Sequence, residues 1–103
     1  MDFRDVVIEF IKTVPKGKVV SYGQVALACG KPTGAREVGR VLRIIDATSE
    51  TIPWWRVVNA KGEISIKGNW TATKELQAQL LEREGVEIKN GFILNFALKR
   101  FTK

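Results

Sequence analysis

The chain opens with apolar residues at helical spacing. Asp2 precedes them as a good N-cap, with Asp5 three residues further on as in a capping box. Pro15 and Gly17 follow the pattern and stop it, so we predict a helix between Asp2 and Pro15. The face that this helix turns to the core is predicted to carry Phe3, Val6, Val7, Phe10 and Val14.

Two more helical patterns follow a short extended piece at residues 18–20. Ser21 is a good N-cap for the first of them, SYGQVALAC, which stops at Gly30-Lys31-Pro32. Thr33 is predicted to cap the second, TGAREVGRVLRII. Two helices joined by a short turn with a glycine predict a helix-turn-helix over about residues 21–45.

The second of these helices has two different faces. The inward face is predicted to carry Ala35, Val38, Gly39 and Leu42. Another face is a basic stripe made of Arg36, Arg40 and Arg43. Such a stripe suits an anionic partner, and the alternative is a solvated face whose charge Glu37 tempers.

The second half of the chain alternates between loops and short apolar pieces. A polar loop precedes Pro53, and NAKGE is predicted to be a hairpin loop, with Gly62 at positive φ, that leads to Ile64 and Ile66. A fourth helix starting at Thr71 or Thr73 is predicted to end before Gly85, and the tail FILNFALKRF to pack back on the domain. We therefore expect residues 1–103 to form one domain, mainly α with a small β-hairpin.

Composition limits the chemistry. The chain has no histidine and one cysteine, Cys29, so the usual general base and any cysteine metal cluster are missing, and no cofactor or metal is expected. No apolar run is long enough to span a membrane and the start lacks a secretion signal, so we expect an intracellular protein. A net charge of +6 favours an anionic partner, with nucleic acid first and an anionic membrane second, although solubility alone also explains it.

Several motifs appear in an order that is typical of one family. They are Ser21-Tyr22 at the start of a helix, Ala35-Arg36-x-Val38-Gly39 on the next, Pro53-x-x-Arg56-Val57 after a loop, and Glu84-Gly85. About two thirds of the chain, residues 17–87, therefore resembles the DNA-binding domain of the O6-alkylguanine-DNA alkyltransferases. The resemblance implies a winged-helix-like helix-turn-helix domain of the alkyltransferase DNA-binding type.

The chain departs from these enzymes at the reacting atoms. They carry Pro-Cys-His-Arg-Val, whereas this chain reads Pro-Trp-Trp-Arg-Val, with Trp54 at the cysteine position and Trp55 at the histidine position. It is most similar to the alkyltransferase-like proteins, which have tryptophan in place of the cysteine. The resemblance implies a non-enzymatic protein that binds double-stranded DNA with O6-alkylguanine and passes the lesion to nucleotide excision repair proteins.

The resemblance also implies roles for single residues. The helix from Thr33 is expected in the minor groove, with Arg36 filling the base stack and Tyr22 promoting flipping of the nucleotide. The residues expected to bind DNA are Ser21, Tyr22, Thr33, Gly34, Ala35, Arg36, Arg40 and Arg43. Those expected to line the lesion pocket are Tyr22, Pro53, Trp54 and Val57. Lys67 and Gly68 stand where the family has a pocket tyrosine and serine.

The residues also allow other interpretations. Trp54 and Trp55 are core residues in the simplest alternative, and Arg56 and Glu84 are expected to be structural. One rival function is an active transferase that uses Cys29 or another nucleophile, and the other is a sequence-specific regulator that reads the major groove. We expect a monomer in the cytoplasm and nucleoid, or in the nucleus of a eukaryote.

Overall fold

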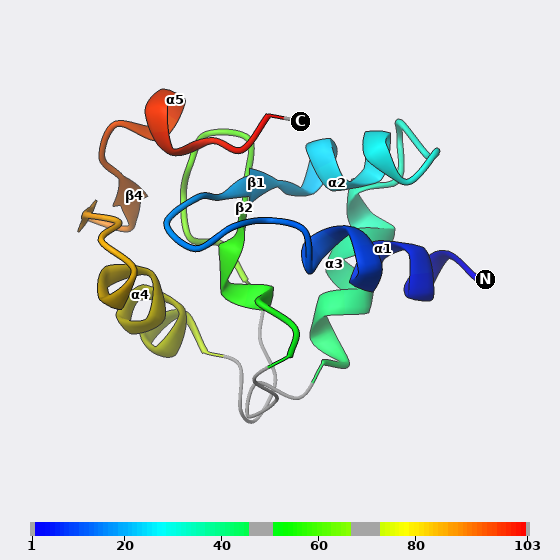
Figure 1. The fold of residues 1–103 in the computed structure, drawn as a ribbon, viewed down its shortest axis with the longest axis horizontal. Helices are drawn as coiled ribbons and strands as arrows, with labels where there is room; N and C mark the ends of the chain where they lie inside the picture. The colour runs from blue at the N-terminus through cyan, green and yellow to red at the C-terminus, as the bar shows by residue number, and fades with distance from the viewer. Residues whose placement is uncertain (1, 46–50, 67–72, 103) are drawn as a thin grey trace.

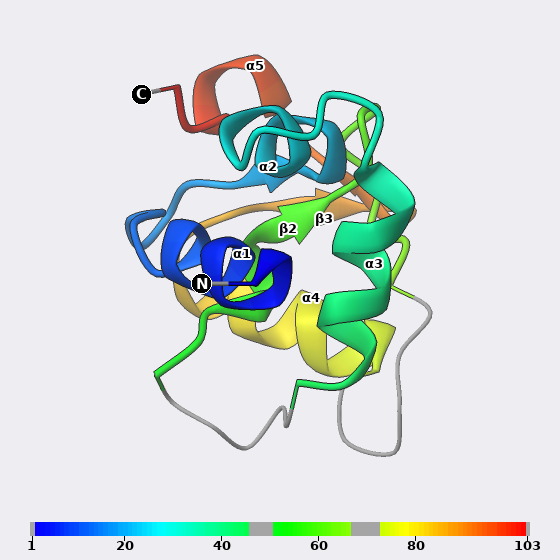
Figure 2. The ribbon, with the colours of Figure 1, turned by 90° about the vertical axis from the view of Figure 1, so that its right-hand side faces the viewer.

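The computed structural model describes residues 2–45, 51–66 and 73–102. Helices α1 (Phe3–Ile11), α2 (Tyr22–Ala28) and α3 (Ala35–Arg43) contact one another and form one part of the domain (Figures 1 and 2). Helix α4 (Lys74–Arg83) contacts the short 3-10 turn η1 (Trp54–Arg56) on the other side. The predicted mainly helical fold is confirmed.

Predicted N-caps hold three of the helices. Asp2 Oδ1 accepts the backbone N–H of Asp5 at 2.9 Å, and Thr73 Oγ1 accepts that of Leu76 at 3.1 Å. Ser21 and Gln24 form a capping box, in which each side chain accepts the other residue's backbone N–H. These side chains satisfy orphan donors at the helix starts, so local sequence fixes where α1, α2 and α4 begin. The alternative start at Thr71 lies outside the described residues.

The predicted cap of α3 at Thr33 is wrong. Gly34 is the N-cap and makes no side-chain capping bond, and Thr33 is exposed. The backbone N–H of Gly34 donates to the Lys31 carbonyl at 2.8 Å, and this turn carries the chain one residue further before the helix starts. A Cβ at Gly34 would lie 2.9 Å from Lys31 Cβ, so the tight turn favours glycine there.

The core follows the predicted stripes only in part. On α3, Val38 and Leu42 are buried as predicted, but Ala35 and Gly39 are only half-buried. The buried positions of α1 and the turn after it are Val7, Ile11 and Val14, whereas the predicted Phe3, Val6 and Phe10 are half-buried. Helical spacing identifies the buried side of each helix, but the neighbouring elements decide which residues on its margins lose contact with water.

Two short strands join the halves of the domain. Strand β1 (Val20–Ser21) pairs in parallel with β2 (Val57–Val58), with Val20 opposite Val57. The predicted turn at NAKGE is present, since Gly62 has φ +78° and Asn59 N–H donates to the Glu63 carbonyl at 3.1 Å. The hairpin predicted to follow it is wrong, because the backbone after the turn bonds instead to residues near Gly91.

The true hairpin lies further along the chain. Strands β3 (Ile88–Lys89) and β4 (Phe92–Ile93) are antiparallel across Asn90-Gly91, whose φ values of 53° and 82° are those of a type I′ turn. The Asn-Gly pair is the sequence signal that marks it. Helix α5 (Phe96–Lys99) follows, and the tail packs back as predicted, with Phe101 N–H donating to the Val19 carbonyl at 2.7 Å.

Helix α4 ends as predicted. Gly85 has φ +87°, and its backbone N–H donates to the Glu82 carbonyl at 3.1 Å. The left-handed conformation there favours glycine and turns the chain toward β3. Over the described residues, none of the helices is both long and apolar enough to cross a membrane.

Candidate nucleic-acid interface

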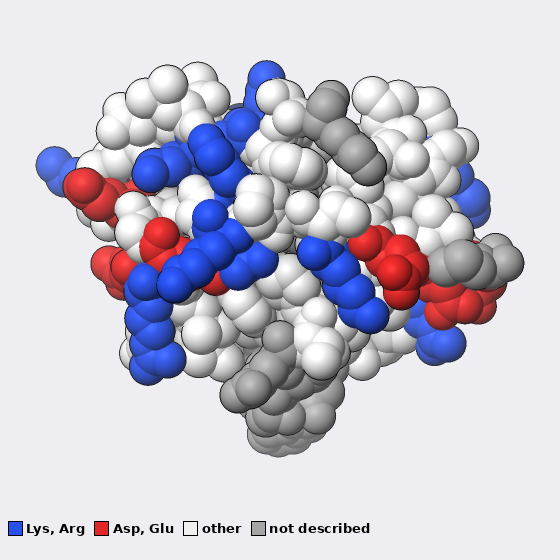
Figure 3. Space-filling view, viewed as in Figure 1, with Lys and Arg blue, Asp and Glu red and all other residues white. Residues whose placement is uncertain are grey.

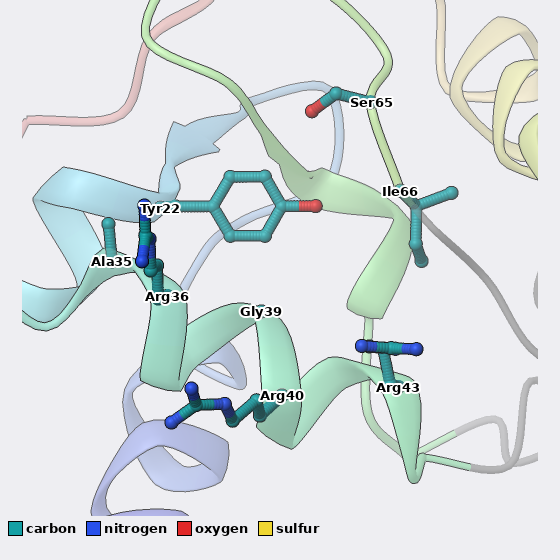
Figure 4. Close-up of a pocket in the computed structure, with 8 residues that line it drawn as sticks. All are labelled: Tyr22, Ala35, Arg36, Gly39, Arg40, Arg43, Ser65 and Ile66. Atoms are coloured by element: carbon teal, nitrogen blue, oxygen red, sulfur yellow. The ribbon is translucent and has the colours of Figure 1, made fainter.

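A pocket of about 570 Å³ opens between α2, α3 and the segment that follows the NAKGE turn. Figure 4 shows the Tyr22 ring reaching from α2 toward Ser65 and Ile66, with α3 along the other side. The volume lies within the usual range for small-molecule sites. Its lining among the described residues comprises Tyr22, Ala35, Arg36, Gly39, Arg40, Arg43, Ser65 and Ile66.

Tyr22 places a neutral hydroxyl at this pocket. It is the first residue of α2, so the Ser21 cap fixes where its side chain leaves the backbone. Burial raises the pKa of Tyr22, and a side-chain hydrogen bond with Ser65 acts in the opposite direction. The phenol therefore stays protonated at neutral pH, and its half-buried ring presents both a flat apolar face and a polar tip.

Three arginines make the α3 side of the pocket positive. Arg36 stands in the first turn of α3, and Arg40 and Arg43 follow on the same face (Figure 4). Glu37 does not temper this stripe, because its carboxylate pairs with Lys31 Nζ at 2.9 Å. The stripe therefore suits an anion such as a phosphate backbone.

Another face of the domain carries basic and acidic side chains side by side, unlike the arginine stripe of α3 (Figure 3). Helix α3 lies behind α1 in Figure 1 and along the right-hand edge in Figure 2. On the face shown in Figure 3, Lys and Arg lie beside Asp and Glu. The described lining of the pocket has three arginines and no acidic residue, so the pocket is the better candidate for an anionic partner.

Trp54 is completely buried, with 0% of its surface exposed, and belongs to the main core cluster. Its Nε1 has no hydrogen-bond partner among the described residues. Pro53 and Val57 are buried as well, and the described lining of the pocket includes none of the three. Of the four residues predicted to line a lesion pocket, the described lining therefore contains Tyr22 alone.

The residue after Trp54 joins a network around a buried carboxylate. Glu84 accepts hydrogen bonds from Arg56, from Trp55 Nε1 at 2.9 Å and from the Gly17 backbone at 3.2 Å. Arg56 also donates to the Val14 carbonyl at 2.7 Å. Burial alone would raise the pKa of Glu84, but these hydrogen bonds and the charge of Arg56 outweigh it and leave the pKa lowered. This network agrees with the structural roles predicted for Arg56 and Glu84.

The remaining residues predicted to bind DNA are not part of the pocket's described lining. The Ser21 side chain caps α2, Thr33 is exposed in the turn before α3, and Gly34 is buried as the cap of α3. Cys29 is half-buried, and burial raises the pKa of its thiol, which disfavours the reactive thiolate.

Two pocket residues had no signal in the sequence. Ser65 and Ile66 reach the pocket because the chain after Gly62 turns toward β4. Neither position shows a pattern that separates it from an ordinary strand residue. Lys67 and Gly68, which the resemblance placed at the pocket, lie outside the described residues.

Comparison with known sequences identifies the family. The model of the 6-O-methylguanine DNA methyltransferase DNA-binding domain matches residues 2–86. The DNA base-flipping protein of Vibrio parahaemolyticus is 41% identical over 91 residues, covering 88% of this chain and 85% of the relative. Alkyltransferase-like protein 1 of Schizosaccharomyces pombe is 38% identical over 87 residues, covering 84% of this chain and 79% of the relative.

Solved structures agree with this assignment. S. pombe Atl1 in complex with damaged DNA containing O6-carboxymethylguanine matches with a TM-score of 0.87 and 33% identity, over 98% of this chain and 95% of that one. The O6-methylguanine methyltransferase of Mycobacterium tuberculosis matches with a TM-score of 0.69 and 30% identity, over 82% of this chain and 48% of that one. The chain therefore belongs to the family of the 6-O-methylguanine DNA methyltransferase DNA-binding domain, and within it to the alkyltransferase-like, or DNA base-flipping, proteins.

Proposed function

We propose that this protein binds double-stranded DNA containing O6-alkylguanine and flips the damaged nucleotide out of the helix without transferring the alkyl group. The observation that carries the proposal is the pocket itself, whose described lining includes Tyr22 and three arginines of α3. The S. pombe relative, with which this chain shares its fold, was solved with DNA carrying O6-carboxymethylguanine.

The arrangement supports binding through α3. Arg36 is exposed in the first turn, where the partial positive charge of the helix start adds to its own. In the proposed complex α3 lies in the minor groove and Arg36 fills the space that the flipped nucleotide leaves. Tyr22 contacts the displaced nucleotide from the opposite wall, while Arg40 and Arg43 line the binding surface beside it. Flipping costs a few kcal/mol, and less for a base that pairs badly, which favours a lesion over guanine.

Trp54, together with Pro53 and Val57, forms the proposed floor against which the alkyl group rests. The ring lies in the core beneath the helix-turn-helix, so this step requires the entering base to reach a side chain that is buried before DNA binds. Contact with an aromatic face is worth about 1–3 kcal/mol per base.

The absence of alkyl transfer follows from two substitutions. The positions of the family's cysteine and histidine hold Trp54 and Trp55, and an indole is not a useful nucleophile for this displacement. Glu84 remains, but Arg56 and Trp55 occupy its carboxylate. Incubation with DNA containing O6-methylguanine should leave the protein mass unchanged, whereas a stable gain of one methyl group would establish an enzyme.

The deciding experiment is a titration of two duplexes that differ only in guanine or O6-methylguanine at one position. We expect tighter binding of the damaged duplex. A sequence-specific regulator would instead prefer a defined undamaged site and ignore the modification, so equal affinities would refute the proposal. Once bound, the protein marks the lesion for nucleotide excision repair inside the cell, acting as a monomer.

A further inference from the structure

We propose that Trp55 is a positioning residue, which holds Trp54 in place by means of its hydrogen bond to Glu84. The inference rests on the proposed function, in which Trp54 forms the floor of the lesion pocket. Trp55 itself is half-buried and is not among the described residues that line the pocket, so it acts on the lesion through its neighbour.

The position of Trp55 is fixed from three directions. Its indole Nε1–H donates to Glu84 Oε2 at 2.9 Å, and its backbone carbonyl accepts from Gln77 Nε2 at 3.1 Å. The guanidinium of Arg56 lies over the ring, 5.4 Å from the centroid. A side chain held at its polar tip, its face and its backbone has little freedom to rotate.

Glu84 is a hydrogen-bond acceptor for the indole whose own position is fixed by other donors. Its side chain is only 8% exposed, and the Arg56 guanidinium binds the carboxylate with Nε and Nη2. A fourth donor, the backbone N–H of Gly17, comes from the loop after α1. The acceptor is therefore charged and immobile, and a hydrogen bond to such a group is stronger than one between neutral partners.

Trp55 in turn orients Trp54 through a contact between their rings. The two rings meet edge to face, with centroids 6.0 Å apart and an angle of 87° between the planes, the geometry that aromatic pairs favour. Trp54 Nε1 has no partner among the described residues, so no polar contact from that part of the chain fixes its ring. Within the described residues, the edge-to-face contact thus adds a directional interaction to the apolar core packing that surrounds Trp54.

The positioning role explains why a tryptophan at position 55 suits a site that does not transfer alkyl groups. The family's residue here is a histidine, which also donates a ring N–H. An indole keeps the donor and adds ring area for the contact with Trp54, but it cannot act as a base. Trp55→Phe removes the donor and keeps an aromatic ring, whereas Trp55→His keeps a donor on a smaller ring.

The test compares these variants by the ratio of affinities for the O6-methylguanine and guanine duplexes. The control is Ile93→Val, a small change in a buried cluster with Val58 and Leu81 against which Trp55 also packs, so it alters packing near Trp55 without removing its hydrogen bond. We expect Trp55→Phe to lower the ratio about fivefold, with affinity for undamaged DNA within about twofold of wild type, and Trp55→His to restore most of the ratio. Ile93→Val should keep the wild-type ratio.

Three outcomes would overturn the inference: an unchanged ratio in folded Trp55→Phe, no recovery in Trp55→His, or an equal loss in Ile93→Val. If the wild-type protein itself shows no preference, the proposed function fails instead. Spectra of ¹⁵N-labelled tryptophan check the same point without DNA. The Trp54 indole signal should be broader in Trp55→Phe than in wild type, and as sharp as wild type in Trp55→His. An unbroadened signal in Trp55→Phe would contradict the positioning role.

Discussion

The Arg56 guanidinium binds the Glu84 carboxylate through two nitrogens, with Nη2 2.6 Å from Oε2 and Nε 3.0 Å from Oε1. The two side chains are 14% and 8% exposed. Arg56 ends the turn that carries both tryptophans, and Glu84 is the C-cap of α4. The pair therefore fixes the tryptophan turn to a helix that lies far along the chain.

Arg56→Ala should strongly destabilise the fold. The change leaves Glu84 as a buried carboxylate without its counter-ion and also removes the donor to the Val14 carbonyl, so we expect a loss of about 3 kcal/mol in the free energy of unfolding. Urea denaturation followed by tryptophan fluorescence measures it. Arg83→Ala, which removes an equal charge from an exposed position, should change stability by less than about 0.5 kcal/mol. Equal effects of both variants would show that the ion pair is unimportant.

Acid should weaken the fold through Glu84. Its pKa is lowered in the folded protein, so its contribution to stability is complete above the unfolded-state pKa and disappears as pH falls through the folded-state value. The urea midpoint should therefore stay level near neutral pH and drop in the acid range below the ordinary glutamate pKa. Glu84→Gln should be less stable at neutral pH and show a shallower acid drop. A drop as steep as that of wild type would assign acid sensitivity to other carboxylates.

Arg36→Ala should reduce the preference for damaged DNA. Without a side chain to fill the stack, the flipped state loses support, and we expect a cost of about 1–3 kcal/mol in binding of the O6-methylguanine duplex. Fluorescence anisotropy with both duplexes measures the change. Arg83→Ala again provides a control of equal charge. Tyr22→Ala should also weaken lesion binding, and unchanged affinity in both Arg36→Ala and Tyr22→Ala would refute nucleotide flipping.

Arg40→Ala should weaken binding to damaged and undamaged DNA alike. Its guanidinium is exposed on the basic stripe, where it suits a phosphate rather than a base. Titrations over a range of salt concentrations should show a slope of log affinity against log salt that is smaller by about one. A loss confined to the damaged duplex would place Arg40 at the lesion instead.

Trp54→Cys should not restore alkyl transfer. The new thiol would stand beside Trp55, which cannot accept its proton, and the Glu84 carboxylate is already bound by Arg56. Mass spectrometry after incubation with DNA containing O6-methylguanine should show no methyl adduct. Transfer by this single variant would show that no base is needed. The double variant Trp54→Cys/Trp55→His, which supplies both a thiol and a base, is compared in the same assay.

Much of this protein could be predicted from local sequence. Asp2, Ser21 and Thr73 cap their helices through side chains only three residues away, and Gly85 ends α4 because the conformation there favours glycine. The family motifs follow the same logic, since they are short and lie within single elements. The Asn90-Gly91 hairpin was equally available from the sequence, because that dipeptide satisfies both positive φ values of a type I′ turn.

The tertiary structure decided what depends on distant contacts. Spacing could not show that Val57 pairs with Val20, or that Ser65 meets Tyr22 across a pocket, because these partners are far apart along the chain. The same holds for the two tryptophans. The sequence predicted that neither carries the family's chemistry, and only packing against α4 placed Trp55 between Glu84 and Trp54.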